Sequence, residues 1–422
     1  MPPDRKRLKL MVVGAGPVGL LFARRLIRQQ GARGFDIRVV DAQSPLNWEV
    51  QRIDPRVYAL SRESQWLFGD LWPAIAARRL SPYRRMCVWE GDNPSGDSSI
   101  SFDSADVGEP DLGHIVEDSL LRSVLLDDLA RSDVEIRFDV GVEALDYDYG
   151  NGSGSGNGRG PVTVTMSDGT SATADLVVGA DGANSKVRSA VGIKSINKNY
   201  AQRAVVTHVT SERPHAETAW QRFLPDGPLA FLPLADGRSS IVWTNSEAAA
   251  EVLLAANEDK FLRELESASG GILGALGPCT ERLSFPLRFA HATRYSRPGV
   301  ALIGDSAHAV HPLAGQGMNL GLRDAAVLAD TLVAALAAGE YPADDLVLRR
   351  YARAQKAHNL SMQLAFDGLN ELFSGRTPDW AASIRGLGLG LVNRLGPAKR
   401  LLMRRALGVD HALGGTASDH AT

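Results

Sequence analysis

The sequence predicts a mixed α/β protein with a parallel sheet, an inserted antiparallel sheet and a helical C-terminal region. Three observations predict this fold class. Residues 8–40 give an apolar strand, a glycine-rich turn, an amphipathic helix and a second apolar strand, which is a βαβ unit. Residues 81–102 and 204–242 alternate apolar and polar side chains and contain aromatic residues, as antiparallel strands do. From residue 346 onward the pattern is mostly helical.

The composition is that of an ordinary globular protein of 422 residues, with 44% hydrophobic and 23% charged residues. A net charge of −3 argues against nucleic acid as a partner. The two cysteines, Cys87 and Cys279, are far apart, which excludes a disulfide scaffold and a dithiol centre. No apolar run reaches the roughly 20 residues of a membrane span, so we expect a cytoplasmic protein, with peripheral contact to the inner membrane as an option.

The first motif is a GxGxxG turn between the first strand and helix. Gly14 permits the tight turn, Gly16 lets a pyrophosphate approach the backbone, and Gly19 permits close packing of helix on strand. Asp41 ends the second strand, where a carboxylate can accept hydrogen bonds from ribose hydroxyls. Together these residues predict a Rossmann-like dinucleotide site, but they do not separate NAD from FAD.

In two further segments an apolar strand also ends at a carboxylate. An apolar strand ends at Asp181, and Ser185 lies near the start of the following helix, which is also what a simple strand-to-helix turn requires. A third strand ends at Gly304 and Asp305, where a carboxylate can hold a polyol hydroxyl. The loop that follows opens into a helix whose N-terminal N–H groups can face a developing anion.

These three segments, in this order, resemble the flavoprotein hydroxylases of the para-hydroxybenzoate hydroxylase class. Residues 311–324 match the pattern HPLAGQGxNLGxxD of the ubiquinone-biosynthesis hydroxylases at every position. The resemblance extends over nearly the whole chain, including residues 112–118 and 226–234. The chain departs from that pattern in the glycine-rich segment 150–160, in Asp118 where asparagine is usual, and in Ser306 where alanine is usual.

The resemblance implies FAD as cofactor and NAD(P)H as co-substrate. It implies contacts to FAD from three sets of residues: Gly14, Gly16, Gly19, Asp41 and Arg56 at the adenosine diphosphate part; Asp181, Gly304 and Asp305 in the second and third segments; and Pro312, Gly315, Gln316, Gly317, Met318 and Asn319 at the flavin ring. Arg52 and Arg56 are the candidate anchors for NAD(P)H, because no second dinucleotide fold is visible.

The resemblance also implies a reaction. NAD(P)H reduces the flavin, O₂ adds to give a C4a-hydroperoxyflavin, and the aromatic ring of a polyprenylated phenol in ubiquinone biosynthesis is hydroxylated. The protein must orient the substrate, stabilise an anion and exclude water. No catalytic acid or base stands out in the sequence. The loop at Pro312, expected over the flavin, is the best candidate for a catalytic element.

Four residues are candidates for an apolar substrate wall on the inserted sheet: Trp220, Phe223, Phe231 and Pro233. Each of them, taken singly, is explained better as sheet core. His308 and His311 form an HxxH on a turn, but two histidines without a third ligand favour a loop-fixing role over a metal site. Six basic residues and no acidic ones lie in residues 380–409, which fits a solvated helix face or an anionic membrane surface. These six are Arg385, Arg394, Lys399, Arg400, Arg404 and Arg405.

The expected domains are discontinuous. Residues 1–75, 104–195 and 291–345 form the FAD-binding domain, residues 76–103 and 196–290 the substrate domain, residues 346–412 the C-terminal helices, and residues 413–422 a disordered tail. Segment 150–160 is flanked by strand-like residues, so an elongated hairpin loop is favoured over a domain linker.

Three alternatives stay open. A catabolic or secondary-metabolite aromatic hydroxylase would share the fold, because fold alone does not decide function. A non-catalytic FAD-containing subunit of a quinone-biosynthesis complex would keep the same motifs. An NAD-dependent dehydrogenase would share only the first motif and leave the other two unexplained.

Overall fold

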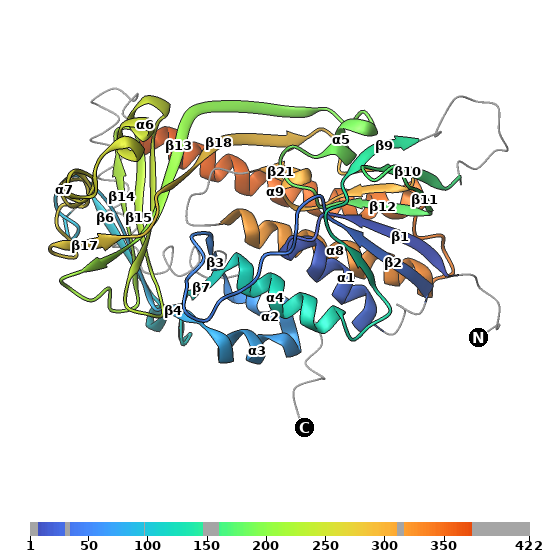
Figure 1. Cartoon of the computed structure of the whole chain (residues 1–422), viewed down its shortest axis with the longest axis horizontal. Coiled ribbons are helices and arrows are strands. Elements are labelled where there is room, and N and C mark those ends of the chain that lie inside the picture. Colours follow the sequence, from blue (N-terminus) through green and yellow to red (C-terminus); the bar gives the residue numbers. More distant parts are fainter. Residues whose placement is uncertain (1–6, 30–33, 97, 147–159, 310–315, 374–422) are drawn as a thin grey trace.

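The computed structural model describes residues 7–29, 34–96, 98–146, 160–309 and 316–373. A parallel sheet with its helices forms one half, and a large, mostly antiparallel sheet stands at the other end (Figure 1). Two long strands, β13 (Ser195–Ser211) and β18 (Leu283–Ala292), run side by side from one half to the other.

The first half is built on a six-stranded sheet of order β19-β20-β12-β1-β2-β8. Its strands are β1 (Leu8–Val13), β2 (Phe35–Val40), β8 (Glu135–Arg137), β12 (Leu176–Gly179), β19 (Ser296–Arg297) and β20 (Val300–Leu302). All neighbours pair in parallel except β19 with β20. The central strands are continuous apolar runs because both faces of such a sheet are covered.

Helices cover this sheet and complete the main core. They are α1 (Pro17–Arg28), α4 (Asp118–Leu129), α5 (Lys186–Ala190), α8 (Gln316–Ala337) and α9 (Asp345–Phe373). Helix α1 packs against α4 and α8, and α8 against α9. Proline at the first position of α1 supplies a preset φ where no N–H partner is needed.

The second half is a nine-stranded sheet of order β21-β18-β13-β16-β15-β14-β5-β6, with β17 also paired to β13. Its other strands are β5 (Arg85–Glu90), β6 (Ser99–Asp103), β14 (Thr218–Leu224), β15 (Gly227–Pro233), β16 (Ser239–Ser246), β17 (Leu276–Cys279) and β21 (His308–Ala309). Helices α6 (Glu247–Ala255) and α7 (Glu258–Ser269) bury one face of it around Phe231, Trp243 and Phe261.

Two expectations for this sheet need correction. Strand β13 begins at Ser195, not near residue 204, because its first residues are polar and mostly exposed and show no apolar alternation. Strands β5 and β14 pair in parallel. They come from distant parts of the chain, so no hairpin fixes them as antiparallel.

Two three-stranded sheets complete the fold. One has the order β3-β7-β4, from β3 (Val57–Leu60), β4 (Ser81–Tyr83) and β7 (Gly113–Glu117), and lies beside α2 (Arg62–Phe68) and α3 (Trp72–Arg78). The other joins β9 (Val142–Asp146), β10 (Val162–Met166) and β11 (Ser171–Ala174). Antiparallel pairing of β9 with β10 confirms that segment 150–160 interrupts a hairpin.

Several expectations fall on residues outside the described ranges: most of segment 150–160 itself, His311, Pro312 and Gly315, the six basic residues of 380–409, and the tail 413–422. In the part of the chain that the structure describes, no helix combines the length and the apolar character needed to cross a membrane.

Candidate cofactor and active site

The glycine turn after β1 is shaped by contacts too close for any side chain. A Cβ on Gly14 would lie 2.3 Å from the carbonyl oxygen of Ala180, and one on Gly19 would lie 2.1 Å from that of Gly14. Gly14 also has φ +111°, a conformation that favours glycine. Around Gly16, by contrast, the only atom of the described residues within 4 Å of a Cβ position is Nη2 of Arg122, at 4.0 Å. The space over Gly16 is therefore open.

The start of α1 faces this open space without a capping side chain, and its first turn holds no acidic residue. Its N-terminal N–H groups and the positive end of its dipole can therefore receive an anion. Asp41 lies beside the turn, where Oδ2 accepts from Ala15 N at 2.6 Å and Oδ1 accepts from Gln43 N at 2.9 Å. The Asp41 carboxylate therefore stabilises the glycine turn by accepting from its main chain, and it follows the end of β2.

The second segment lies against the first. The main chain of Ala180 contacts the turn, and Asp181 Oδ2 accepts from the N–H groups of Lys186 and Val187 at the start of α5. Its Oδ1 is buried and has no hydrogen-bond partner among the described residues. Burial raises the pKa of Asp181 above its ordinary value. The carboxylate therefore acts as a helix cap and keeps one oxygen unused.

The third segment reaches the same place. A Cβ on Gly304 would lie 3.3 Å from the side chain of Val18 in α1, and one on Gly321 of α8 would lie 3.2 Å from Cα of Gly304. The Ser306 hydroxyl donates to the carbonyl of Ile303 at 2.7 Å and to that of Gly179 at the end of β12. The serine at the usual alanine position thus ties the second and third segments together.

Two ionic side chains at this junction are left unpaired. Among the described residues, neither the Asp305 carboxylate nor the Arg56 guanidinium has a hydrogen-bond or ion-pair partner, although Arg56 lies over the Tyr58 ring at 5.5 Å. Asp305 is solvent-accessible, yet burial raises its pKa, with His308 and Arg56 opposing that shift. Tyr58, and then Asp118 and Asp305, raise the pKa of Arg56.

The first turn of α8 is anchored through Asn319. Its side-chain amide donates to Ala59 O at 2.9 Å, and its Oδ1 accepts from Ser61 N at 3.0 Å and from Ser64 Oγ at 2.7 Å. The helix start is therefore held on β3 and α2. Gly317 and Met318 are half-buried in the same turn. Gln316 begins the helix.

His308, the described member of the HxxH, lies in a buried ion pair with Asp324 of α8. Among the described residues no group of three or more His, Cys, Asp or Glu could hold a metal.

The four candidate wall residues do not lie together. Trp220 and Phe231 are paired across β14 and β15 and pack with α6 and α7, and alternation puts Pro233 on that same face. Phe223 lies on the opposite face, with Val88 and Ile100. The opposite face, and not this helix-covered one, packs on β3 and β7.

Apart from Phe223, sequence reasoning missed the residues of this other sheet face. Ala219, Leu232 and Leu234 form an apolar cluster with Ile53 before β3, Ala59 of β3 and Ile115 of β7. Strand alternation was the signal that could have found them, since each is one position from a candidate residue.

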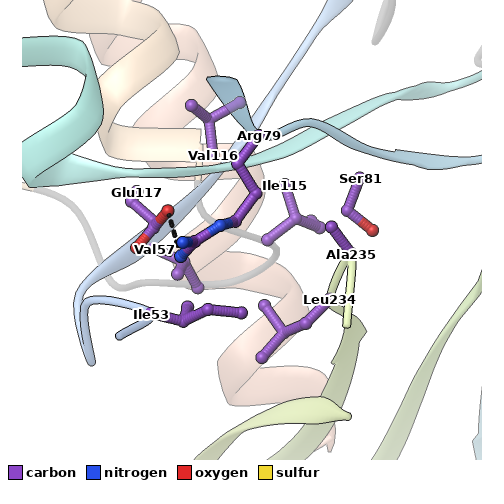
Figure 2. Close-up of a pocket in the computed structure, with 9 residues that line it drawn as sticks. All are labelled: Ile53, Val57, Arg79, Ser81, Ile115, Val116, Glu117, Leu234 and Ala235. Carbon is purple, nitrogen blue, oxygen red and sulfur yellow. Dashed lines mark hydrogen bonds and ion pairs between the residues drawn. The ribbon is translucent and has the colours of Figure 1, made fainter. Parts of the chain in front are cut away.

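Figure 2 shows a small recess in this contact, where Ile53, Ile115 and Leu234 converge from separate elements. The Arg79 guanidinium closes one side and lies 3.0 Å from the Glu117 carboxylate. Arg79 also donates to main-chain oxygens of the segment before β3, including that of Arg52 at 3.2 Å. The ion pair thus fixes the loop that leads to Arg56.

Comparison with known proteins agrees with this geometry. The sequence profile of the FAD binding domain family matches residues 81–361. The 3-demethoxyubiquinol 3-hydroxylase of Escherichia coli is 36% identical over 95% of this chain and 98% of that protein. The ubiquinone hydroxylase UbiL of Rhodospirillum rubrum is 37% identical over 94% of this chain and 89% of that protein. The chain belongs to the family of FAD-dependent hydroxylases that includes these enzymes. It is a flavoprotein monooxygenase.

Solved structures show that the hydroxylase shares a known fold. The p-nitrophenol 4-monooxygenase PnpA of Pseudomonas putida superposes with a TM-score of 0.74 at 21% identity, covering 98% of this chain and all of that one. HpxO of Klebsiella pneumoniae, complexed with FAD and uric acid, gives a TM-score of 0.71 at 19% identity, covering 95% and 98% of the chains. The expected mixed α/β fold and the FAD cofactor are confirmed.

The described residues of the hydroxylase fit FAD. The open space over Gly16, the uncapped start of α1, and the unpaired charges of Arg56 and Asp305 are what a ligand with an anionic pyrophosphate and a polyol chain requires.

Proposed function

We propose that the hydroxylase adds an oxygen atom from O₂ to the aromatic ring of a polyprenylated phenol or quinol in ubiquinone biosynthesis, with NAD(P)H as reductant. The observation that carries the proposal is the contact of three distant segments around one glycine turn, beside the unpaired charges of Arg56 and Asp305 in the described part of the chain. The printed functions of the relatives, 3-demethoxyubiquinol 3-hydroxylase and ubiquinone hydroxylase, supply the substrate class.

Bound FAD would supply the redox and oxygen-activating chemistry. The remaining tasks belong to the chain. The start of α1 and Arg56 would hold the pyrophosphate, and Asp305 would accept hydrogen bonds from the ribityl hydroxyls. The N-terminus of α8, fixed by Asn319, would stabilise negative charge on the flavin ring.

The substrate would lie between the bound flavin ring and the sheet face that carries Ala219, Leu232 and Leu234. That face is apolar, so it excludes water and suits a prenyl chain. In this proposal the nine-stranded sheet forms the substrate domain, and residues 1–75, 104–195 and 291–345 form the FAD domain. Arg52 is exposed and lies in the loop to which Arg79 donates hydrogen bonds. It would contact NAD(P)H together with Arg56.

Mass spectrometry of quinones in a strain lacking this chain tests the function. We expect an under-hydroxylated prenyl phenol to accumulate, and its mass and ring pattern to identify the carbon that is hydroxylated. Complementation should restore the ubiquinone pool. A normal pool in the deletion strain would favour a catabolic or secondary-metabolite hydroxylase.

The purified flavoprotein tests catalysis separately. A prenyl phenol should stimulate NAD(P)H oxidation and yield a hydroxylated product. If the strain accumulates the intermediate but the purified protein shows no stimulated oxidation, a non-catalytic subunit of a quinone-biosynthesis complex is the better description.

A prenylated substrate resides in lipid, so we further propose contact with an anionic membrane surface through the basic residues of 380–409. The full-length protein should sediment with anionic liposomes. A variant with all six basic residues neutralised should sediment less, and equal sedimentation would exclude this contact.

A further inference from the structure

Asp118 opens α4 with a buried carboxylate next to the glycine turn, and its side chain is 1% exposed. The Tyr58 hydroxyl donates to its Oδ1 at 2.8 Å. Nε of Arg122, one helical turn later, lies 2.8 Å from its Oδ2. An acid at this position would repel phosphate if it stood alone, but here an arginine of the same helix neutralises it.

This contact is an ion pair and not a hydrogen bond, because neither Nε of Arg122 nor Oδ2 of Asp118 has a hydrogen-bond partner among the described residues. Nη2 is the nearest atom to the Cβ position of Gly16, at 4.0 Å, so the guanidinium points at the open part of the glycine turn. Within the described part of the chain, neither Nη1 nor Nη2 has a hydrogen-bond partner, and the side chain is 13% exposed. A planar guanidinium with free donors on one edge suits a phosphate oxygen pair.

The surroundings point to the same ligand. The start of α1 has neither an acidic first turn nor a side-chain cap. The guanidinium of Arg56 lies over the Tyr58 ring. The main-chain oxygen of Arg56 accepts a hydrogen bond from Asp118 N at 3.0 Å. Arg122 and the N-terminus of α1 therefore face the space over Gly16, and the main chain of Arg56 is bonded to the residue that pairs with Arg122.

We propose that Arg122 binds the pyrophosphate of FAD directly, beside Arg56, and that Asp118 is the positioning residue that holds Arg122 in place through Nε. Tyr58 completes the arrangement by satisfying the second oxygen of Asp118. The inference requires only that the hydroxylase binds FAD, so it stands apart from the choice of aromatic substrate.

The experiment measures FAD release from purified holoprotein and its rebinding, followed by flavin fluorescence, in Arg122→Gln, Asp118→Asn and the double variant. The matched control is Arg25→Gln, which alters an arginine of α1 that is paired with Asp330 instead. We expect Arg122→Gln to weaken FAD binding by roughly 10- to 100-fold, and the control to change it less than about twofold.

The double variant separates direct binding from charge neutralisation. If Arg122 contacts the pyrophosphate, removing Asp118 as well leaves FAD binding about tenfold or more weaker than in Asp118→Asn alone. If Arg122 only neutralises Asp118, the double variant binds FAD as Asp118→Asn does, and the proposal is overturned.

Arg122→Lys gives a second test that keeps the buried acid neutralised. Lysine supplies one charge but cannot hold Asp118 and a phosphate at the same time with a planar fork. We expect about tenfold weaker FAD binding in this variant, lessened at high salt. Binding equal to that of the unaltered protein would contradict the proposal.

Discussion

Asp324 of α8 and His308 of β21 form a fully buried ion pair, with 2.5 Å between Oδ2 and Nε2. The same carboxylate accepts from Gly304 N at 3.0 Å and from the side chain of Asn359 in α9 at 2.8 Å. Burial alone would lower the pKa of His308, but the Asp324 carboxylate raises it above its ordinary value. The pair therefore joins α8, α9 and the turn that carries Asp305.

Asp324→Asn should destabilise the hydroxylase strongly, because it removes the buried carboxylate that pairs with His308 and accepts from Gly304 N and the Asn359 side chain. Loss of one partner of a buried pair costs about 3–5 kcal/mol. Urea unfolding of the FAD-loaded protein at neutral pH measures this. Asp330→Asn on the same helix breaks the partly exposed pair with Arg25 and should cost about 1 kcal/mol or less. Equal losses of unfolding free energy in the two variants would show that the buried pair stabilises the protein no more than the partly exposed one.

Alanine at Gly14 should lower the stability of the fold, whereas alanine at Gly16 should weaken FAD binding. Gly14→Ala places a methyl group on the Ala180 carbonyl and requires φ +111°, so we expect a loss of about 2 kcal/mol or more in unfolding free energy. The methyl group of Gly16→Ala meets no atom of the described residues closer than 4.0 Å, so the apoprotein should keep its stability, while the methyl group takes space that FAD would fill. Thermal unfolding of apoprotein and FAD release distinguish the two. A stable Gly14→Ala protein would refute the steric argument.

The two faces of β15 should respond differently to truncation. Phe231→Ala removes a ring from the core under α6 and α7 and should cost about 3–5 kcal/mol, with KM for the aromatic substrate unchanged. Leu232→Ala, on the face toward Ile53 and Ala59, should cost about 2–5 kcal/mol and also raise KM. Steady-state kinetics beside urea unfolding tests this. A KM change in Phe231→Ala as large as in Leu232→Ala would mean that the substrate uses the other face.

His208 gives a pH dependence with a defined sign. It is buried on β13, its Nε2 lies 3.1 Å from the carbonyl oxygen of Asp54, and burial lowers its pKa below the ordinary value. The unfolded chain takes up a proton near pH ~6.5, whereas the folded protein resists it. Stability should therefore fall as pH drops through about 6.5, and His208→Gln should lose this part of the dependence. Urea unfolding between pH 8 and about pH 5.5 measures it, and parallel curves for both proteins would rule it out.

Local signals in the sequence were enough for the dinucleotide unit. The apolar runs Leu8–Val13 and Phe35–Val40 form strands as expected, the helix starts just after Gly16, and Asp41 follows the second strand. Glycine turns, strand ends and helix starts depend on neighbouring residues, so one chain segment suffices to predict them. Residues 311–324 identified the family for the same reason, because a contiguous pattern needs no fold to be recognised.

Only the tertiary structure decided which charges are paired and which sheet face meets the cofactor domain. Alternation predicts that Phe231 and Leu232 point to opposite faces, but not which face α6 and α7 cover. Likewise, the sequence shows an acid at position 118 but not that Arg122 neutralises it and turns its free edge to Gly16. Contacts between elements far apart in the chain depend on how the whole core packs, and no local pattern contains that information.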